Sequence, residues 1–127
     1  MIKEVRINDN AQMGDECGLA IAKALLQSRS TKVCHLAGTK ISGKSAEMLG
    51  EVLRQSHSLK DLDISNNLII MDDIELLATA FKESQIECLN IRGNIVSAEE
   101  IVAFEHLLMP VSTMTKRKFI FRRHNFN

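Results

Sequence analysis

The sequence of 127 residues contains neither tryptophan nor tyrosine, and it has a single proline. It has no run of about 18 apolar residues, so it offers no candidate membrane span, and its first residues do not resemble the apolar core of a signal peptide. The three cysteines are an odd number without paired spacing, which argues against a disulfide framework. We therefore expect one cytoplasmic domain that covers residues 1–127.

Motifs for chemistry are also missing from the sequence. No pair of cysteines or histidines has the spacing of zinc ligands, and no glycine-rich phosphate loop is present, so we expect no metal and no cofactor. The formal net charge is zero, but its distribution is uneven. All acidic residues lie before position 111, whereas the last 17 residues hold five cations, which are Lys116, Arg117, Lys118, Arg122 and Arg123.

What is present is a repeated pattern, which is clearest between Leu59 and Ile69. This stretch reads L-x-x-L-x-I-x-x-N-x-I, a repeat pattern of leucines in which isoleucine can replace leucine. The pattern recurs in phase 27 residues later, around Asn94, and 28 residues earlier, with Thr39 in the place of the asparagine. A further copy begins at Ile2. The four copies predict four repeats and a closing strand, near residues 2–30, 31–58, 59–85, 86–113 and 117–123.

Each copy predicts a short strand, a turn and a helix. The asparagine is expected at the turn, where its amide can satisfy backbone groups that would otherwise be buried without partners. After each turn, apolar residues at i, i+3 and i+7 predict one inward helical face. These faces are Gly18, Ile21 and Leu25; Ala46, Leu49 and Leu53; Ile74, Leu77 and Phe81; and Ile101, Phe104 and Leu108.

The expected fold is an α/β right-handed solenoid, a horseshoe segment of about four repeats with parallel strands on its concave side. The repeat length and the alternation with full helices resemble the ribonuclease-inhibitor-like subfamily of leucine-rich repeats over residues 2–109. The resemblance implies a non-catalytic scaffold that binds another protein. Comparable small repeat proteins include fragments of larger scaffolds and bacterial effectors, and an effector would act in a host cytoplasm.

Side chains that alternate with the core positions of each strand are expected on the concave face. The candidate partner-binding residues are Arg6, His35, Asp63, Asn90 and Arg92. A Cys–His–Asp catalytic group of Cys88, His35 and Asp63 is one interpretation of this row. Cys88 would lie two strands from His35, about 9.6 Å away. That distance favours the alternative, a surface ion pair near a free thiol.

Two other functions compete with protein binding through the concave face. One is a regulator of the GTPase-activating type, which uses the same class of repeat. The other is binding of nucleic acid or an anionic surface through the basic tail, whose alternative interpretation is a solvated cap on an acidic body. The N-terminal strand edge, from Ile2, is expected to be open. It allows three outcomes: a fragment of a longer array, a tolerated exposure, or a weak homodimer.

Overall fold

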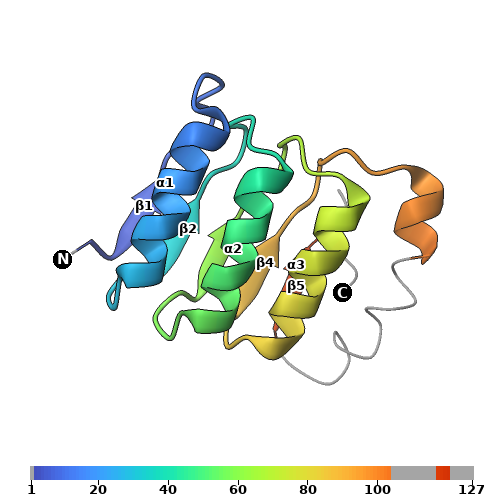
Figure 1. Ribbon diagram of the computed structural model, residues 1–127. Helices are drawn as coiled ribbons and strands as arrows, with labels where there is room; N and C mark the ends of the chain where they lie inside the picture. Colours follow the sequence, from blue (N-terminus) through green and yellow to red (C-terminus); the bar gives the residue numbers. More distant parts are fainter. Residues whose placement is uncertain (1, 104–116, 121–127) are drawn as a thin grey trace.

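The computed structural model describes residues 2–103 and 117–120. They form a five-stranded parallel sheet with its strands in chain order. The strands are β1 (Glu4–Arg6), β2 (Val33–His35), β3 (Asp61–Asp63), β4 (Cys88–Asn90) and β5 (Lys118–Ile120). One face of the sheet is covered by α1 (Gly14–Gln27), α2 (Gly43–Gln55) and α3 (Met71–Glu83), which lie side by side (Figure 1). No described helix covers the other face, which we call the open face.

The register of the strands follows the repeated pattern. The central residue of each strand points towards the helices, and these residues are aligned across the sheet: Val5, Cys34, Leu62, Leu89 and Phe119. The three inner members of this row are fully buried, whereas Val5 and Phe119 at the two ends are half-buried. The expected parallel strands and their register are therefore found, including the closing strand within residues 118–120.

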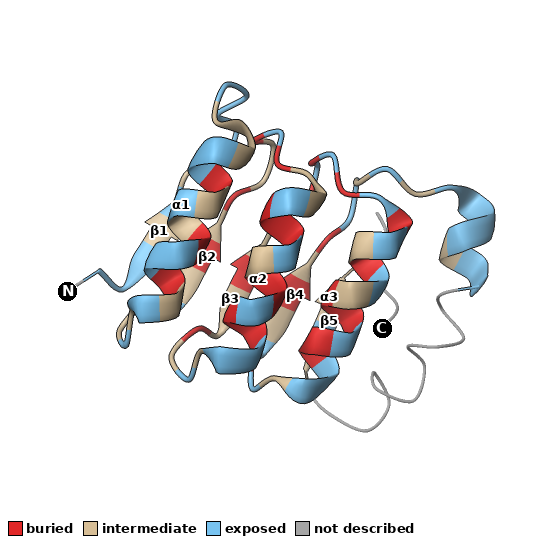
Figure 2. Ribbon diagram, in the orientation of Figure 1, coloured by how far each residue is buried: buried red, intermediate tan, exposed pale blue. Residues whose placement is uncertain are grey.

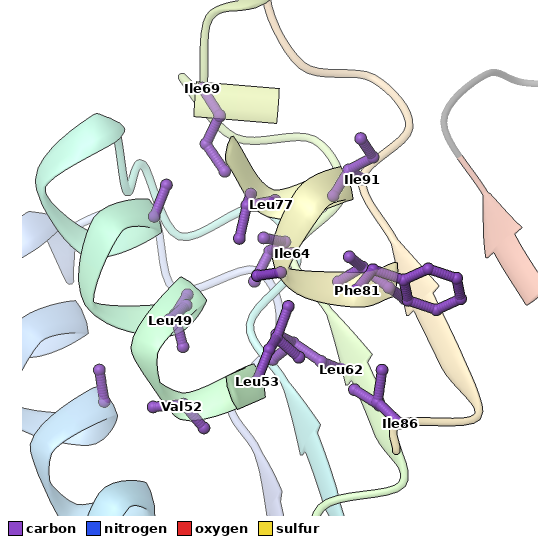
Figure 3. Close-up of a cluster of buried hydrophobic side chains, with 14 of the residues drawn as sticks. Leu49, Val52, Leu53, Leu62, Ile64, Ile69, Leu77, Phe81, Ile86 and Ile91 are labelled. Carbon is purple, nitrogen blue, oxygen red and sulfur yellow. The ribbon is translucent and has the colours of Figure 1, made fainter. Parts of the chain in front are cut away.

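The core lies between the sheet and the helices. Figure 2 shows buried positions on the sides of the helices that face the sheet and one another. Leu49 of α2 and Leu77 of α3 are fully buried, and Figure 3 shows them with Leu62 of β3 in one apolar cluster. Phe81 extends this cluster towards β5, where its ring meets Phe119 edge-on with centroids 5.2 Å apart. The predicted inward faces of the second and third helices are thus confirmed.

A row of left-handed backbone positions marks the turns after the strands. Asp9, Gly38, Asn66 and Gly93 have φ values of 62°, 68°, 55° and 73° and lie at equivalent places in the four turns. Such φ values favour glycine and are tolerated by asparagine and aspartate. A Cβ at Gly93 would collide with the side chain of Asn66, and one at Gly38 would approach that of Asp9. Large and small residues therefore alternate along this row.

The fourth repeat is described only as far as residue 103. Residues 98–103 are helical and begin with a capping box, in which Ser97 and Glu100 exchange side-chain and backbone hydrogen bonds of 2.9 and 3.1 Å. However, Ile101 is only half-buried and Val102 is 56% exposed. Phe104 and Leu108, the other residues of the predicted inward face, lie outside the described residues.

The expectation of a four-repeat leucine-rich-repeat solenoid is therefore wrong. Among the described residues, three helices pack on one side of a five-stranded sheet, and the fourth helical turn adds no comparable buried face. The chain is a small two-layer α/β domain. The local pattern specified each described strand and turn, but it did not specify the overall architecture.

Candidate functional site

The open face of the sheet carries four of the five predicted partner-binding residues. Arg6, His35, Asp63 and Asn90 are register partners on β1 to β4 and form one row across the sheet. The fifth, Arg92, lies in the turn after β4, where its side chain is exposed and its N–H donates to the Asn90 Oδ1 atom at 3.2 Å. The structure thus brings four of the predicted residues together in one row and places Arg92 in the turn that follows it.

A hydrogen-bonded chain of side chains runs across β1 to β3. An Arg6 guanidinium nitrogen lies 3.0 Å from Nδ1 of His35, and Nε2 of His35 lies 3.1 Å from Oδ2 of Asp61. A guanidinium only donates hydrogen bonds, so Nδ1 must accept and the imidazole proton is on Nε2, which donates to Asp61. At the other end, Arg6 pairs with Glu4 at 3.4 Å.

The partner of His35 is therefore Asp61, which was not among the predicted site residues. Asp63 is the register neighbour of His35, but its Oδ1 atom accepts the N–H of Ser65 at 2.9 Å and so holds the turn after β3. Asp61 belongs to the adjacent open-face row, two residues earlier on the same strand. Diagonal cross-strand neighbours are within reach of long side chains, so this row was the sequence signal that pointed to Asp61.

Among the described residues, the surroundings of Cys34 and Cys88 do not favour a nucleophilic thiol. Burial raises the pKa of the Cys88 thiol; Asp61 and Asp63 raise it further, and Lys118 opposes them. Burial and Asp61 also raise the pKa of Cys34 to about 12. The thiolate is the nucleophilic form of cysteine, so both shifts work against reactivity. No described hydrogen bond joins Cys88 to His35, and among the described residues no group of potential ligands could hold a metal ion.

The basic tail is only partly described, and Arg117 has a structural place in it. Its Nε atom donates to the Ile86 carbonyl at 2.7 Å, and Nη2 donates to the Ser84 hydroxyl at 3.0 Å and to the Phe81 carbonyl. The guanidinium lies 4.0 Å over the Phe81 ring, and desolvation lowers its pKa. Arg117 thus fastens β5 to the C-terminal end of α3, where a cation is favourable.

The other tail cations differ from Arg117. Lys118 is exposed at the β5 end of the open face, whereas Lys116, Arg122 and Arg123 lie outside the described residues.

A pocket of about 420 Å³ lies in the loop between β1 and α1, and its lining residues are Ile7, Asp9, Asn10, Ala11, Gln12 and Met13. Asp9 is the only titratable side chain in this lining, so the pocket offers no acid–base pair. Within the described ranges, every helix is too short or too polar to span a bilayer.

Comparison with known proteins places this fold. The sequence matches no protein-family model and no curated protein. Among solved structures, the chain is similar to the tropomodulin C-terminal domain of Caenorhabditis elegans, with a TM-score of 0.78 and 19% identity over 98% of this chain and 76% of that one. It is also similar to actin-binding site 2 of leiomodin-1, with a TM-score of 0.76 and 16% identity over 98% and 72%.

The assignment to the ribonuclease-inhibitor-like leucine-rich repeats is therefore wrong. The structures that share the fold include the tropomodulin and leiomodin domains, with which this chain shares the parallel α/β arrangement. At these identities the similarity concerns the fold alone. The repeat spacing misled because strands that follow one another in a parallel sheet, each with a helix on the same face, produce a similar alternation of apolar residues.

Proposed function

We propose that this chain is a non-catalytic protein-binding module that holds its partner on the open face of the sheet. The observation that carries the proposal is the arrangement of that face. Arg6, His35, Asp63 and Asn90 lie in one row on four paired strands. The core is built from the alternate strand positions, so these side chains lie on the open face and outside the core.

Actin is the partner to test first. One of the two similar structures is actin-binding site 2 of leiomodin-1. Because this chain spans nearly the same fold, its open face can be tested directly against monomeric and filamentous actin. The proposal concerns binding alone and assigns no effect on the assembly of filaments.

The charges of the open face favour a protein over a nucleic acid or an anionic surface. Arg6 and Lys118 lie on the two outer strands, whereas Asp61 and Asp63 lie on the central strand. A phosphate backbone would meet repulsion at the centre of this face. In the tail, Arg117 already binds the end of α3. No observation favours a regulator of the GTPase-activating type.

The test is sedimentation of the full chain with actin filaments and affinity capture by immobilised actin monomers. We expect the wild type to bind at least one form and Arg92→Glu to weaken binding by about tenfold or more, because it reverses an exposed charge in the turn that follows the open-face residue Asn90. The Arg92 guanidinium makes no hydrogen bond with a described residue, so the variant should fold normally. Lys23→Glu, on the exposed side of α1, is the matched control and should bind like the wild type.

A second variant decides whether the site is correctly placed. The double variant Asp63→Lys with Arg92→Glu reverses one charge within the proposed row and one in the turn after β4, and its fold is checked by far-ultraviolet circular dichroism. Unchanged affinity in a folded double variant would move the site away from the open face. Failure of the wild type to bind either form of actin would remove actin as the partner.

A further inference from the structure

The free edge of the sheet at β1 has unpaired backbone groups. On the side facing β2, the Lys3 carbonyl accepts from Lys32 at 2.7 Å, and the Ile7 N–H donates to His35 at 2.9 Å. Backbone groups alternate in direction along a strand, so those of Glu4 and Arg6 point away from β2. No described strand lies on that side, because β1 is the first strand of the sheet.

The helix above this edge, α1, has α2 on one side and no described helix on its outer side. Residues of α1 and α2 that are 28 positions apart occupy equivalent places, so Cys17 corresponds to Ser45 and Ala24 to Val52. In α2, Ser45 and Val52 are buried, and Ser45 lies against Gly18 of α1. In α1, Cys17, Ala20 and Ala24 are exposed. The outer flank of α1 is thus a small-residue surface of the kind against which helices pack closely elsewhere in this chain.

We propose that a second copy of the chain occupies this edge, with the two β1 strands paired antiparallel about a two-fold axis at Val5. This arrangement continues the sheet and keeps the helices of both copies on the same side. In an antiparallel pair, two directly opposed residues place their side chains on the same face of the sheet. Three registers satisfy this near the centre of β1: Glu4 opposite Arg6, Glu4 opposite Glu4, or Arg6 opposite Arg6. Each copy also brings the exposed flank of its α1 to the axis.

The charges on β1 select one of these registers. With Val5 on the axis, Glu4 of each copy lies opposite Arg6 of the other, giving two opposite-charge pairs. A shift of the axis to Glu4 or to Arg6 would place like charges together, which is unfavourable between directly opposed residues. Both side chains are 53% exposed, and Arg6 can keep its contact with His35 through Nη1 while its other nitrogens turn to the partner.

The selected register also matches the backbone. Glu4 and Arg6 both direct their N–H and C=O groups to the free edge, so each Glu4–Arg6 pair becomes a hydrogen-bonded pair of an antiparallel ladder. The interface combines a short strand with one helix flank, so we expect a weak dimer that dissociates on dilution. It would place two open faces in one continuous sheet, which goes beyond the single-site binding proposed above.

The test measures molar mass by sedimentation equilibrium from micromolar to millimolar concentrations of the full chain. The wild type should rise towards twice the monomer mass. Glu4→Arg and Arg6→Glu should each remain monomeric, because each opposes like charges at both positions. An equimolar mixture of the two variants should recover the dimer, since the two basic side chains on β1 of one variant then face the two acidic side chains on β1 of the other. Glu51→Arg, exposed on α2, should dimerise like the wild type.

The mixture separates a specific interface from a loss of folding, because misfolded variants would not restore each other. A wild type that stays monomeric throughout the series overturns the proposal. So does a mixture that stays monomeric, or a single variant that dimerises as strongly as the wild type. These results do not depend on actin, so they leave the proposed function to its own experiment.

Discussion

The turns after β1 and β3 both contain an asparagine, but the two asparagines differ in burial and in the number of their hydrogen bonds. Asn67 is 5% exposed; its amide nitrogen donates to the carbonyls of Leu36, Ile64 and Ser65, each at 3.0 Å. Its oxygen accepts from the backbone N–H groups of Thr39 and Ile41 at 2.9 and 3.2 Å. Asn10 is exposed, and its described hydrogen bonds go to the carbonyls of Ile7 and Asn8, at 3.1 and 3.3 Å.

Asn67 differs from Asn10 because the turn of the preceding repeat lies beside it. The local bonds of each asparagine close its own turn, and the sequence pattern is sufficient to specify them. The bonds that Asn67 makes to residues 36–41 require the preceding turn, which is absent on the outer side of Asn10 among the described residues. Asn94 lies between the two cases, because its oxygen accepts from the Ile69 N–H at 3.0 Å but its side chain is only half-buried.

The largest expected effect is at Asn67. Asn67→Ala would leave several buried backbone groups without partners, each costing about 1–3 kcal/mol. We expect the free energy of unfolding to fall by on the order of 3 kcal/mol. Asn10→Ala should cost less than about 1 kcal/mol, because water can replace its bonds. Urea unfolding followed by circular dichroism measures both.

A control for this pair is Asn66→Gly. Asn66 is exposed with φ of 55°, a conformation that glycine adopts without strain, so its unfolding midpoint should change little. Equal losses of stability in Asn67→Ala and Asn10→Ala would contradict the view that neighbouring strands determine the contribution of this position.

Sequence reasoning succeeded where the structure depends on local alternation. The central strand residues, such as Leu62 and Leu89, were predicted because a core side needs apolar residues at every second position. The turn position of Asn67 was predicted because a buried turn needs an amide. The left-handed row that includes Gly38 and Asn66 was not predicted, although its glycine, asparagine and aspartate residues were a visible signal.

It failed where the outcome depends on which side chain reaches which partner. Both Asp61 and Asp63 lie near His35, but Asp63 accepts the N–H of Ser65 in the turn. His35 is therefore paired with Asp61. Arg117 was grouped with the basic tail because its charge is evident in the sequence. Its position over Phe81 depends on the packing of β5 against α3. The solenoid assignment failed for a different reason, since consecutive parallel strands with helices on one face of a sheet produce a similar repeat spacing.

The α1–α2 and α2–α3 interfaces allow a second comparison, between two aspartates in different surroundings. In the first, Asp15 of α1 accepts from the Ser42 N–H at 2.8 Å and from the Ser45 hydroxyl at 2.6 Å, so it caps α2 from outside. Burial raises the pKa of Asp15, but the hydrogen bonds from Ser42 and Ser45 together outweigh it and leave the pKa lowered. In the second, burial raises the pKa of Asp73 of α3, and Glu47 and Asp72 raise it further.

An intermediate effect is expected at Asp15. Because its folded-state pKa lies below the ordinary value of 3.8, its ionised form stabilises the fold above that value, and this contribution is lost as the pH falls through the folded pKa. Asp15→Asn should therefore lower the unfolding free energy by about 1 kcal/mol at neutral pH, as for the loss of a helix cap. The difference from the wild type should shrink in acid, measured by urea unfolding across a pH series.

Glu16→Gln is the control for this experiment, since Glu16 is exposed on the same turn of α1 and makes no described side-chain bond to α2. Its stability should follow the wild type at every pH. A deficit in Asp15→Asn that stayed constant into acid would mean that the carboxylate charge does not contribute and that only the shape of the side chain matters.

The smallest effect has the opposite sign and concerns Asp73. Its raised pKa means that the folded state disfavours its charge, so the cost is present at neutral pH and disappears as the pH falls through the folded pKa. Glu47→Gln removes one of the repelling charges while leaving Asp73 at the start of α3, where the helix dipole favours it. We expect a gain of about 0.2–0.5 kcal/mol at neutral pH, the range for like-charge neighbours on helices. Carbon-13 titration should show the pKa of Asp73 falling in this variant, whereas Glu87→Gln, in the exposed segment before β4, should leave it unchanged. An Asp73 titration unmoved by Glu47→Gln would leave burial and Asp72 as the causes of the shift, and the second interface would then differ from the first in solvation rather than in charge.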